Sequence, residues 1–335
     1  MKVIALVPFK NEELFLPIFM QSLEGLVDAV LGFDDDSTDS SVSLFRKFGG
    51  VLLNDYAGSP LPQEKGPTVQ IRNRLLEFGR KFGGTHFLII DCDEIIIGAA
   101  RTDFKKIANS LKPGDYLSLN LITTWNNFKT YISFPDLRGP REMSFLFADR
   151  PDITYPDKEK FVHFDRIPRS NDGKTTKQMK HNIDESAVLH LSYIGWERAQ
   201  LKQSWYRVTE KELFGRSSQI INETYRFTMN NTPPTEYLRP GMIPEFLDSK
   251  ILALLKSFEA EQSWHLEEIR RILKRNQWSK FTNLEIWHVK QIRDSYEAIF
   301  GFLPNPTPFT RFHEVITLKM NHIRYMYNKL NGIKP

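Results

Sequence analysis

The stretch Phe87-Leu88-Ile89-Ile90-Asp91-Cys92-Asp93-Glu94 joins a short apolar run directly to a cluster of carboxylates. Four consecutive apolar residues predict a strand that is buried on both faces, as the strands of parallel sheets are. In an open α/β sheet, ligands bind beyond the carboxyl ends of the strands. Because Asp91 and Asp93 can both reach one hard cation there, the motif favours Mg²⁺ or Mn²⁺. The alternative is that the two acids are only helix caps or loop residues.

The chain before this stretch alternates between segments typical of strands and of helices. Apolar runs predict strands at 3–7 (ended by Pro8), 27–33, 50–54 and 87–90. Apolar residues at helical spacing predict helices at 11–26, from 41 onwards, and at 69–82. This β-α-β-α-β-α-β order predicts an α/β fold, with a mostly parallel central sheet flanked by helices.

The pattern changes further along the chain. Strands are predicted at 116–123, 144–148, 161–164 and 187–191, followed by helices at 196–214, 245–276, 283–300 and 309–330. A turn-rich, proline-rich segment interrupts this series before the last three helices. We therefore expect an α/β domain over 1–228 with halves 1–100 and 101–228, a connector at 229–244, and a helical C-terminal region over 245–335.

Composition and charge exclude several classes of protein. A single cysteine permits neither an internal disulfide nor a cysteine-rich zinc site. The net charge of +4 does not favour nucleic acid as the main partner. Since we find no signal peptide and no apolar stretch long enough to span a bilayer, we expect a cytoplasmic protein. Segment 250–335 carries 14 basic and 8 acidic residues, so the positive charge lies in the C-terminal region.

A second group of acids follows another buried strand of the same predicted sheet. Asp34, Asp35 and Asp36 would repel one another unless donors or a positive charge lie between them. The hydroxyl and N–H groups of a sugar nucleotide provide such donors. Arg72, in the helix before the first motif, is suited to a diphosphate, whereas Arg74 and Arg80 fit a solvated basic helix face equally well.

Taken together, these motifs resemble the family 2 type of GT-A glycosyltransferases. The matching elements are Val3 to Pro8 with Asn11-Glu12, Asp34 to Asp39, Arg72-Asn73, and Asp91 to Glu94. The D-x-D followed by Glu is similar to the branch that includes family 92 enzymes. The resemblance is specific over about residues 1–100.

The resemblance implies roles for individual residues. It implies a GT-A fold in which Asp91 faces the ribose or the metal and Asp93 is the main metal ligand. Glu94 would support the metal site without binding the metal itself. The residues implied to line the nucleoside pocket are Pro8, Asn11, Glu12, Asp34 and Asp35.

A further metal ligand and a catalytic base remain open at this point. Many GT-A enzymes add a late histidine, for which His190 in a short apolar strand is our candidate, ahead of His163 and His181. A lone histidine on an apolar strand is equally compatible with a core position. Inverting members need a carboxylate base. We expect Glu142, in a loop before a strand, with Asp165 and Asp136 as alternatives.

The sequence thus predicts a glycosyltransferase that uses Mn²⁺ or Mg²⁺ and a nucleoside-diphosphate sugar, with UDP favoured. The acceptor would be a hydroxyl of a glycan or lipid-linked molecule, and the reaction would invert. A haloacid dehalogenase-type phosphatase using Asp91 and Asp93, or a non-catalytic sugar-binding module, is the alternative. Trp125, Trp196 and Trp205 fit sugar stacking or core packing. The basic C-terminal helices fit peripheral membrane contact or, more simply, packing; the oligomeric state is left open.

Overall fold

The computed structural model describes residues 1–55, 68–125, 127–133, 139–155, 168–170, 178–225, 233–247 and 263–304. The chain divides into two compact units. Unit 1 comprises Met1–Ile122, Pro140–Leu191 and Leu238–Ile251, and unit 2 comprises Thr123–Gly139, Ser192–Tyr237 and Leu252–Pro335. The predicted strand 161–164 and the predicted helix 309–330 lie outside the described residues.

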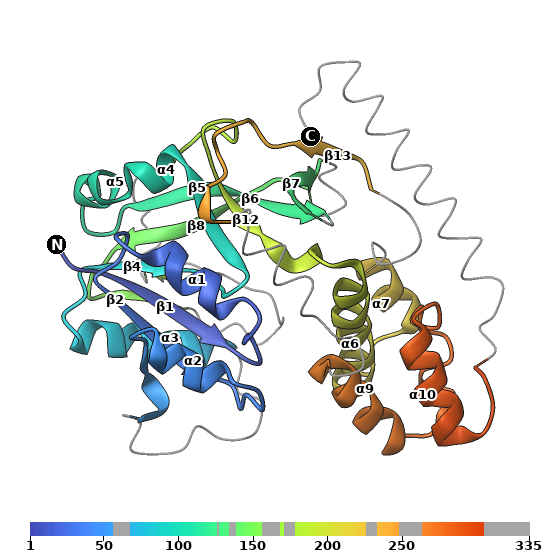
Figure 1. Cartoon of the computed structure of the whole chain (residues 1–335). Coiled ribbons are helices and arrows are strands. Elements are labelled where there is room, and N and C mark those ends of the chain that lie inside the picture. The colour runs from blue at the N-terminus through green and yellow to red at the C-terminus, as the bar shows by residue number, and fades with distance from the viewer. Residues whose placement is uncertain are drawn as a thin grey trace. The chain divides into compact units, whose positions relative to one another are not determined.

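Unit 1 is built on a sheet with a parallel core (Figure 1). Its strands follow the order β6-β8-β4-β1-β2-β3; β1 pairs in parallel with β2 and β4, and β2 with β3, while β8 is antiparallel to β4 and β6. These strands are β1 (Val3–Phe9), β2 (Ala29–Asp34), β3 (Val51–Leu52), β4 (His86–Ile89), β6 (Tyr116–Trp125) and β8 (Arg141–Ala148). The shorter strands are β5 (Glu94–Gly98), β9 (Ile153–Thr154), β10 (Arg169–Ser170), β11 (Gln178–Lys180) and β12 (Ser186–His190).

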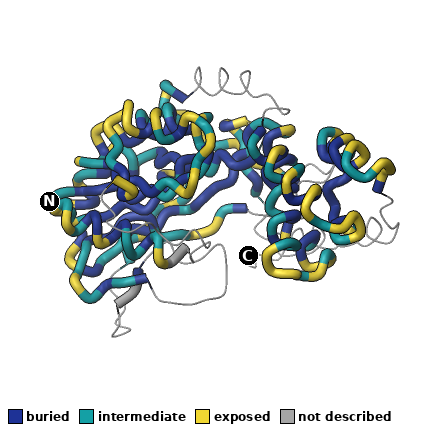
Figure 2. The backbone as a smooth tube through the Cα atoms, turned by 90° about the horizontal axis from the view of Figure 1, so that it is seen from below, coloured by how far each residue is buried: buried dark blue, intermediate teal, exposed yellow. Residues whose placement is uncertain are grey.

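Helices cover both faces of this sheet because successive strand residues point to opposite sides. Val3, Ala5 and Val7 of β1 pack in one apolar cluster with residues of α1, α2, α4 and α5. Ile4 and Leu6 pack in another cluster with α3. Figure 2 shows the strands of this unit as mostly buried. The helices are α1 (Leu16–Leu23), α2 (Ser41–Lys47), α3 (Thr68–Lys81), α4 (Ala99–Thr102) and α5 (Phe104–Ser110), with a 3₁₀ turn η1 (Leu53–Asp55).

The predicted α/β class, with parallel central strands flanked by helices and a helical C-terminal region, is confirmed. Two details differ from the sequence prediction. Strand β1 continues through Pro8 to Phe9, because its pairing with β4 stops at Leu6 and the missing N–H of Pro8 interrupts no ladder on that side. The first helix begins at Leu16 rather than at Asn11, because Asn11 adopts a left-handed backbone (φ 51°) in a loop.

Strand β5, which bears most directly on the carboxylate motif, is one of several elements that the sequence prediction missed. It begins at Glu94, directly after the carboxylate motif, and pairs antiparallel with β12. Neither glycine nor proline stands between β4 and the apolar run Ile95-Ile96-Ile97 to signal a turn. The four residues between the two strands, 90–93, are too few to show a boundary in the apolar pattern.

Unit 2 holds the long helices around a core of its own. Leu201 and Val208 of α6 pack with Ile269 of α9 and Ile292 and Tyr296 of α10. A small antiparallel pair, β7 with β13, also belongs to this unit. Its elements are β7 (Asn127–Ile132), β13 (Thr235–Tyr237), α6 (Trp196–Phe214), α7 (Ser218–Thr224), α9 (Trp264–Lys274) and α10 (Lys290–Phe300), with 3₁₀ turns η3 (Leu191–Tyr193) and η6 (Trp278–Lys280).

Two predicted boundaries differ in this part of the chain. Residues 283–289 form turns rather than the start of a helix, because the side chain of Asn222 bonds the carbonyl of Asn283 (2.9 Å) and the amide of Glu285 (3.0 Å). Helix α6, predicted within the α/β domain, groups with the C-terminal helices. Segment 238–251, predicted as the end of the connector (238–244) and the start of the helical C-terminal region (245–251), belongs to unit 1. The reason is packing: the apolar face of α6 is buried in the core that it shares with α9 and α10.

Candidate functional site

The carboxylate motif after β4 forms a tight turn closed by its own residues. The amide of Glu94 donates to the carbonyl of Asp91 (3.0 Å), and the carboxylate of Glu94 accepts from the amide of Asp91 (3.0 Å). Glu94 is fully buried. Its carboxyl group is therefore held against the backbone of the motif, which fixes how Asp91 and Asp93 leave the strand.

Strand pairing brings His190 to this turn. In the β5–β12 ladder His190 lies opposite Glu94, and the amide of Leu191 donates to the carbonyl of Asp93 (2.7 Å). As a result, Nε2 of His190 lies 3.5 Å from Oδ2 of Asp93. The Asp93 side chain is only 6% exposed and that of His190 16%. Of the predicted histidines, His190 is the one placed here; His181 bonds Ser186 (3.3 Å) before β12, and His163 lies outside the described residues.

Arg72 of α3 faces Asp91 from the other side. Its Nη2 lies 3.9 Å from Oδ1 of Asp91. The arginine is 8% exposed, and its buried Nε and Nη1 have no hydrogen-bond partner within the described part of the chain. Buried donors without partners are costly unless a ligand completes them. A guanidinium with two unused donors suits an anion with several oxygens, such as a diphosphate.

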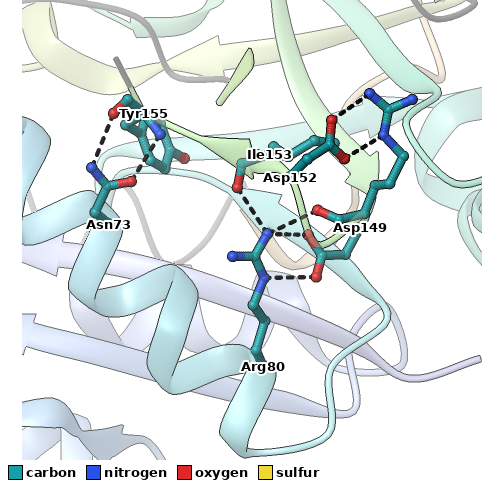
Figure 3. A network of polar contacts seen from close by, with 7 residues as sticks. Asn73, Arg80, Asp149, Asp152, Ile153 and Tyr155 are labelled. Carbon is teal, nitrogen blue, oxygen red and sulfur yellow. Dashed lines mark hydrogen bonds and ion pairs between the residues drawn. The ribbon is translucent and has the colours of Figure 1, made fainter. Parts of the chain in front are cut away.

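Helix α3, which carries Arg72, is attached by polar contacts to residues 149–155 (Figure 3). The side chain of Asn73 accepts from the amide of Tyr155 (2.8 Å) and donates to its carbonyl (3.0 Å). Arg80 makes two bonds of 2.8 Å to the carboxylate of Asp149 and also bonds the carbonyl of Ile153 (2.8 Å). The hydrogen bonds that Arg80 donates to Asp149 raise the pKa of Arg80. Arg80 is therefore an anchor of α3 and not part of a solvated basic face.

The loops after β1 and β2 are held together by Asn11. Its side-chain oxygen accepts from the amides of Thr38 (2.7 Å) and Asp39 (3.3 Å), and its own amide donates to Ser37 Oγ (2.9 Å). Asn11 (φ 51°) and Asp36 (φ 57°) both adopt the left-handed region, which asparagine and aspartate tolerate better than other side chains. Asn11 thus shapes the loop that carries Asp34 and Asp35.

Asp34 ends β2 in a half-buried position. Burial raises its pKa, the bond from Ser37 opposes this, and the charges of Asp36 and Asp35 add to the rise. A residue that the sequence reading missed, Asn54, brackets it: its side chain bonds both the amide and the carbonyl of Asp34 (3.0 Å each). Asn54 belongs to no recognised motif, so nothing in the sequence connected it with Asp34.

The remaining predicted pocket residues lie at the same edge of the sheet. Pro8 of β1 pairs with Phe33 of β2, and the amide of Asp35 donates to the carbonyl of Phe9 (2.9 Å). Glu12 binds Ser41 Oγ through its amide (2.7 Å). Burial raises the pKa of Cys92 well above its usual value, and the negative charge of Glu12 adds to that rise. The loops after β1 and β4 are therefore within electrostatic reach of each other.

Glu142, the predicted base, lies inside β8 and not in a loop before it. Its strand begins at Arg141 because the backbone of 141–144 already pairs with β6. Strand β8 runs antiparallel to β4, so its first residues lie toward the carboxyl end of β4. Glu142 pairs with Nζ of Lys180 (2.9 Å) and accepts a hydrogen bond from Gln178. Asp136 and Asp165 lie outside the described residues.

The donor set at this edge fits a hard divalent cation. Asp93 and His190 supply a carboxylate oxygen and an imidazole nitrogen in contact distance. Within the described ranges, no group of three or more His, Cys, Asp and Glu side chains is gathered as a metal site. Mg²⁺ and Mn²⁺ sites of nucleotide enzymes commonly use one or two protein ligands and complete their shell with phosphate oxygens and water. Asp91, which faces Arg72, is the predicted ligand that the geometry does not join to this pair.

Comparison with known proteins gives matches only to solved structures. No family model matches the sequence, and no curated protein sequence matches it significantly. The chain is similar to S. aureus TarS 1–349 in complex with UDP-GlcNAc, at 16% identity over 89% of this chain and 90% of that chain, with a TM-score of 0.31. A longer S. aureus TarS structure matches at 15% identity over 89% of this chain and 55% of that chain, with a TM-score of 0.34.

A third match is glucosyl-3-phosphoglycerate synthase from Mycobacterium tuberculosis in complex with Mn²⁺, UDP and glucosyl-3-phosphoglycerate. It has 15% identity over 44% of this chain and 56% of that chain, with a TM-score of 0.28. Because the identities and TM-scores are low, what this chain can do is decided by the chemistry of its own residues. Among its described helices, none is long and apolar enough to cross a membrane.

Proposed function

We propose that this chain is a metal-dependent glycosyltransferase of the GT-A type, similar to family 2 enzymes and their D-x-D-E branch. It would take its sugar from a nucleoside-diphosphate sugar, with UDP favoured. The observation that carries the proposal is the grouping at the end of β4. There Asp93 meets His190 (3.5 Å), and Arg72 with two unpartnered donors lies beside Asp91 (3.9 Å). These side chains are suited to a cation and an anion side by side.

Asp93 and His190 would hold Mn²⁺ or Mg²⁺, with Asp91 as the predicted further ligand. When bound, the cation neutralises charge on the diphosphate leaving group. Arg72 acts on the same group: its buried donors lie in a low-dielectric setting where hydrogen bonds to developing negative charge are strong. Glu94 and the β5–β12 pairing keep Asp93 and His190 oriented before the donor arrives.

The nucleoside would lie against the loops after β1 and β2. Asp34 and Asp35 accept hydrogen bonds from base and ribose, while Pro8 and Glu12 border the pocket from β1. Asn11 holds the acidic loop in shape through its contacts to Thr38 and Asp39. A donor that bonds Asp34 also relieves the repulsion that Asp35 and Asp36 impose on it.

The acceptor would be a hydroxyl of a glycan or of a lipid-linked molecule, attacked with inversion. Glu142 is the described candidate for the base. To take a proton, its carboxylate must exchange the contact with Lys180 for the acceptor hydroxyl. Asp165 is the alternative from the sequence. We place the protein in the cytoplasm.

The test is a thermal-shift panel with UDP-, GDP- and CDP-sugars, each with and without Mn²⁺. We expect stabilisation by a UDP-sugar that depends on Mn²⁺ and is lost in Asp93→Asn and His190→Ala. The matched control Asp103→Asn, an exposed carboxylate at the start of α5, should behave as the wild type. Stabilisation by none of these donors would refute the proposal, as would an unchanged response of Asp93→Asn. Hydrolysis of p-nitrophenyl phosphate that requires Asp91 would instead indicate a phosphatase.

A further inference from the structure

Three aromatic side chains of unit 2 form a cluster apart from its hydrophobic core. The ring of Trp125 lies 5.7 Å from that of Tyr193 and 5.1 Å from that of Trp196. None of the three belongs to the apolar cluster that joins α6, α9 and α10. Both tryptophans are partly exposed, whereas Tyr193 is 1% exposed. The cluster therefore presents aromatic surface to solvent over a buried phenol.

The backbone is irregular at Trp125, and again at the segment that carries Tyr193 and Trp196. The β6–β7 register shifts between Thr124 and Trp125, and the hydroxyl of Thr130 bonds the carbonyl of Trp125 (3.0 Å). Such irregularities redirect a side chain out of the regular alternation of a strand. On the other side, a 3₁₀ turn ends at Tyr193, and Gly195 with φ 75° starts α6 so that Trp196 is its first residue.

The buried hydroxyl of Tyr193 is the feature that suggests a ligand. It is buried and has no hydrogen-bond partner within the part of the chain that the structure describes. Buried tyrosine hydroxyls usually find a partner, because burying one without a partner costs free energy. A phenylalanine would fill the same space without that cost. The hydroxyl is therefore an unused hydrogen-bonding group next to two partly exposed indole rings.

We propose that Trp125, Tyr193 and Trp196 form a carbohydrate-binding platform. A pyranose ring has an apolar face of C–H groups, which packs on aromatic rings, and a rim of hydroxyls, one of which would bond Tyr193. The bound sugar is a neutral ring of a glycan. This assignment goes beyond the proposed function, because it gives unit 2 a glycan-binding site of its own. The three side chains carry no charge, so they suit a neutral sugar ring better than a phosphate.

The experiment is saturation-transfer difference NMR on the full chain with maltotriose, cellotriose, chitotriose and mannotriose. We expect at least one trisaccharide to receive saturation at its ring protons. Trp125→Ala and Trp196→Ala should each weaken the apparent affinity at least about tenfold, as central aromatic contacts do. Trp278→Ala is the matched control, because Trp278 is 51% exposed in the same unit and lies outside the cluster.

Tyr193→Phe separates recognition from packing. We expect an affinity loss of about three- to tenfold, the size of one hydrogen bond, with an unchanged or raised melting temperature. A purely structural tyrosine would give the opposite pair of results. The proposal is overturned if no trisaccharide binds, if Trp278→Ala loses as much as Trp125→Ala, or if only free uridine gives transfer that depends on Trp125. The Mn²⁺-dependent shift with a UDP-sugar is measured on the same variants. It should persist in all of them, so failure of the platform is distinguishable from failure of the glycosyltransferase assignment.

Discussion

At the residue scale, the candidate site combines charges that are held in place before any ligand binds. Asp34 is half-buried next to two further acids, and Arg72 is buried with unused donors. Neither arrangement favours the stability of the ligand-free chain, because both keep polar groups away from water without full compensation. Such local costs are typical of binding sites, where the ligand supplies the missing partners.

Asp34→Asn should make the ligand-free protein more stable at pH 7. The pKa of Asp34 is raised above 3.8 in the folded state, so its neutral form is favoured there. Its contribution to stability is therefore present below pH 3.8 and is lost as the pH rises through the folded-state pKa. Asparagine keeps an acceptor for Ser37 without the charge. We expect a gain of less than about 1 kcal/mol after solvent screening.

Urea unfolding at pH 7 and near pH 4 measures this difference. The advantage of Asp34→Asn should shrink at the lower pH, and the same variant should bind the UDP-sugar more weakly. Asp103→Asn, which removes an exposed charge, should show neither effect. An Asp34→Asn protein less stable than the wild type at pH 7 would contradict the assignment of strain to this residue.

At the element scale, strand β5 is what completes the site. It turns the chain back after Glu94 and, through its pairing with β12, sets His190 opposite the carboxylate motif. The far end of the same ladder is fixed at Gly98, which has φ 71° and ψ −153°. A Cβ on Gly98 would lie 2.1 Å from the carbonyl oxygen of Glu185. Only glycine fits this conformation and this close approach of two backbones.

Gly98→Ala should therefore shift the β5–β12 register and move His190 away from Asp93. We expect a loss of at least about 3 kcal/mol in the free energy of unfolding, since both backbone strain and a backbone clash oppose the methyl group. Gly49→Ala is the matched control: Gly49 also has a positive φ (83°), but open space around it, and should cost about 1 kcal/mol. Urea denaturation and the Mn²⁺-dependent thermal shift report the two effects. Equal costs for both variants would show that the close approach to Glu185 does not constrain the ladder.

At the scale of the whole molecule, the chain is not two consecutive domains but two units assembled from alternating segments. Segment 238–251, which follows the proline-rich stretch, returns to unit 1. There the carbonyl of Met242 accepts from the amide of Gly98 (3.3 Å), and Leu247 is fully buried. The residues that support β5 thus include some far beyond the predicted end of the α/β domain.

Leu247→Ala should destabilise unit 1 although it lies well past residue 228. Loss of a buried leucine side chain leaves a cavity and costs about 2–5 kcal/mol. Hydrogen exchange should show reduced protection in β5 and β12, with α9 and α10 little changed. Leu213→Ala in α6 removes a side chain that is 42% exposed and should be nearly silent. Loss of protection confined to the C-terminal helices would contradict the place of segment 238–251 in unit 1.

The sequence by itself determined the local elements and the acidic motifs. Apolar runs and helical periodicity identified β1, β2, β4, α3 and α6, because such patterns depend only on which face of an element is buried. The Asp91–Glu94 motif at the end of a strand could be located for the same reason. Only the tertiary structure decided that His190 rather than His181 meets Asp93, that Arg80 is an anchor, and that α6 belongs with the C-terminal helices. These outcomes depend on the pairing of β5 with β12 and on the packing of segments distant in the chain, and neither is encoded in the spacing of neighbouring residues.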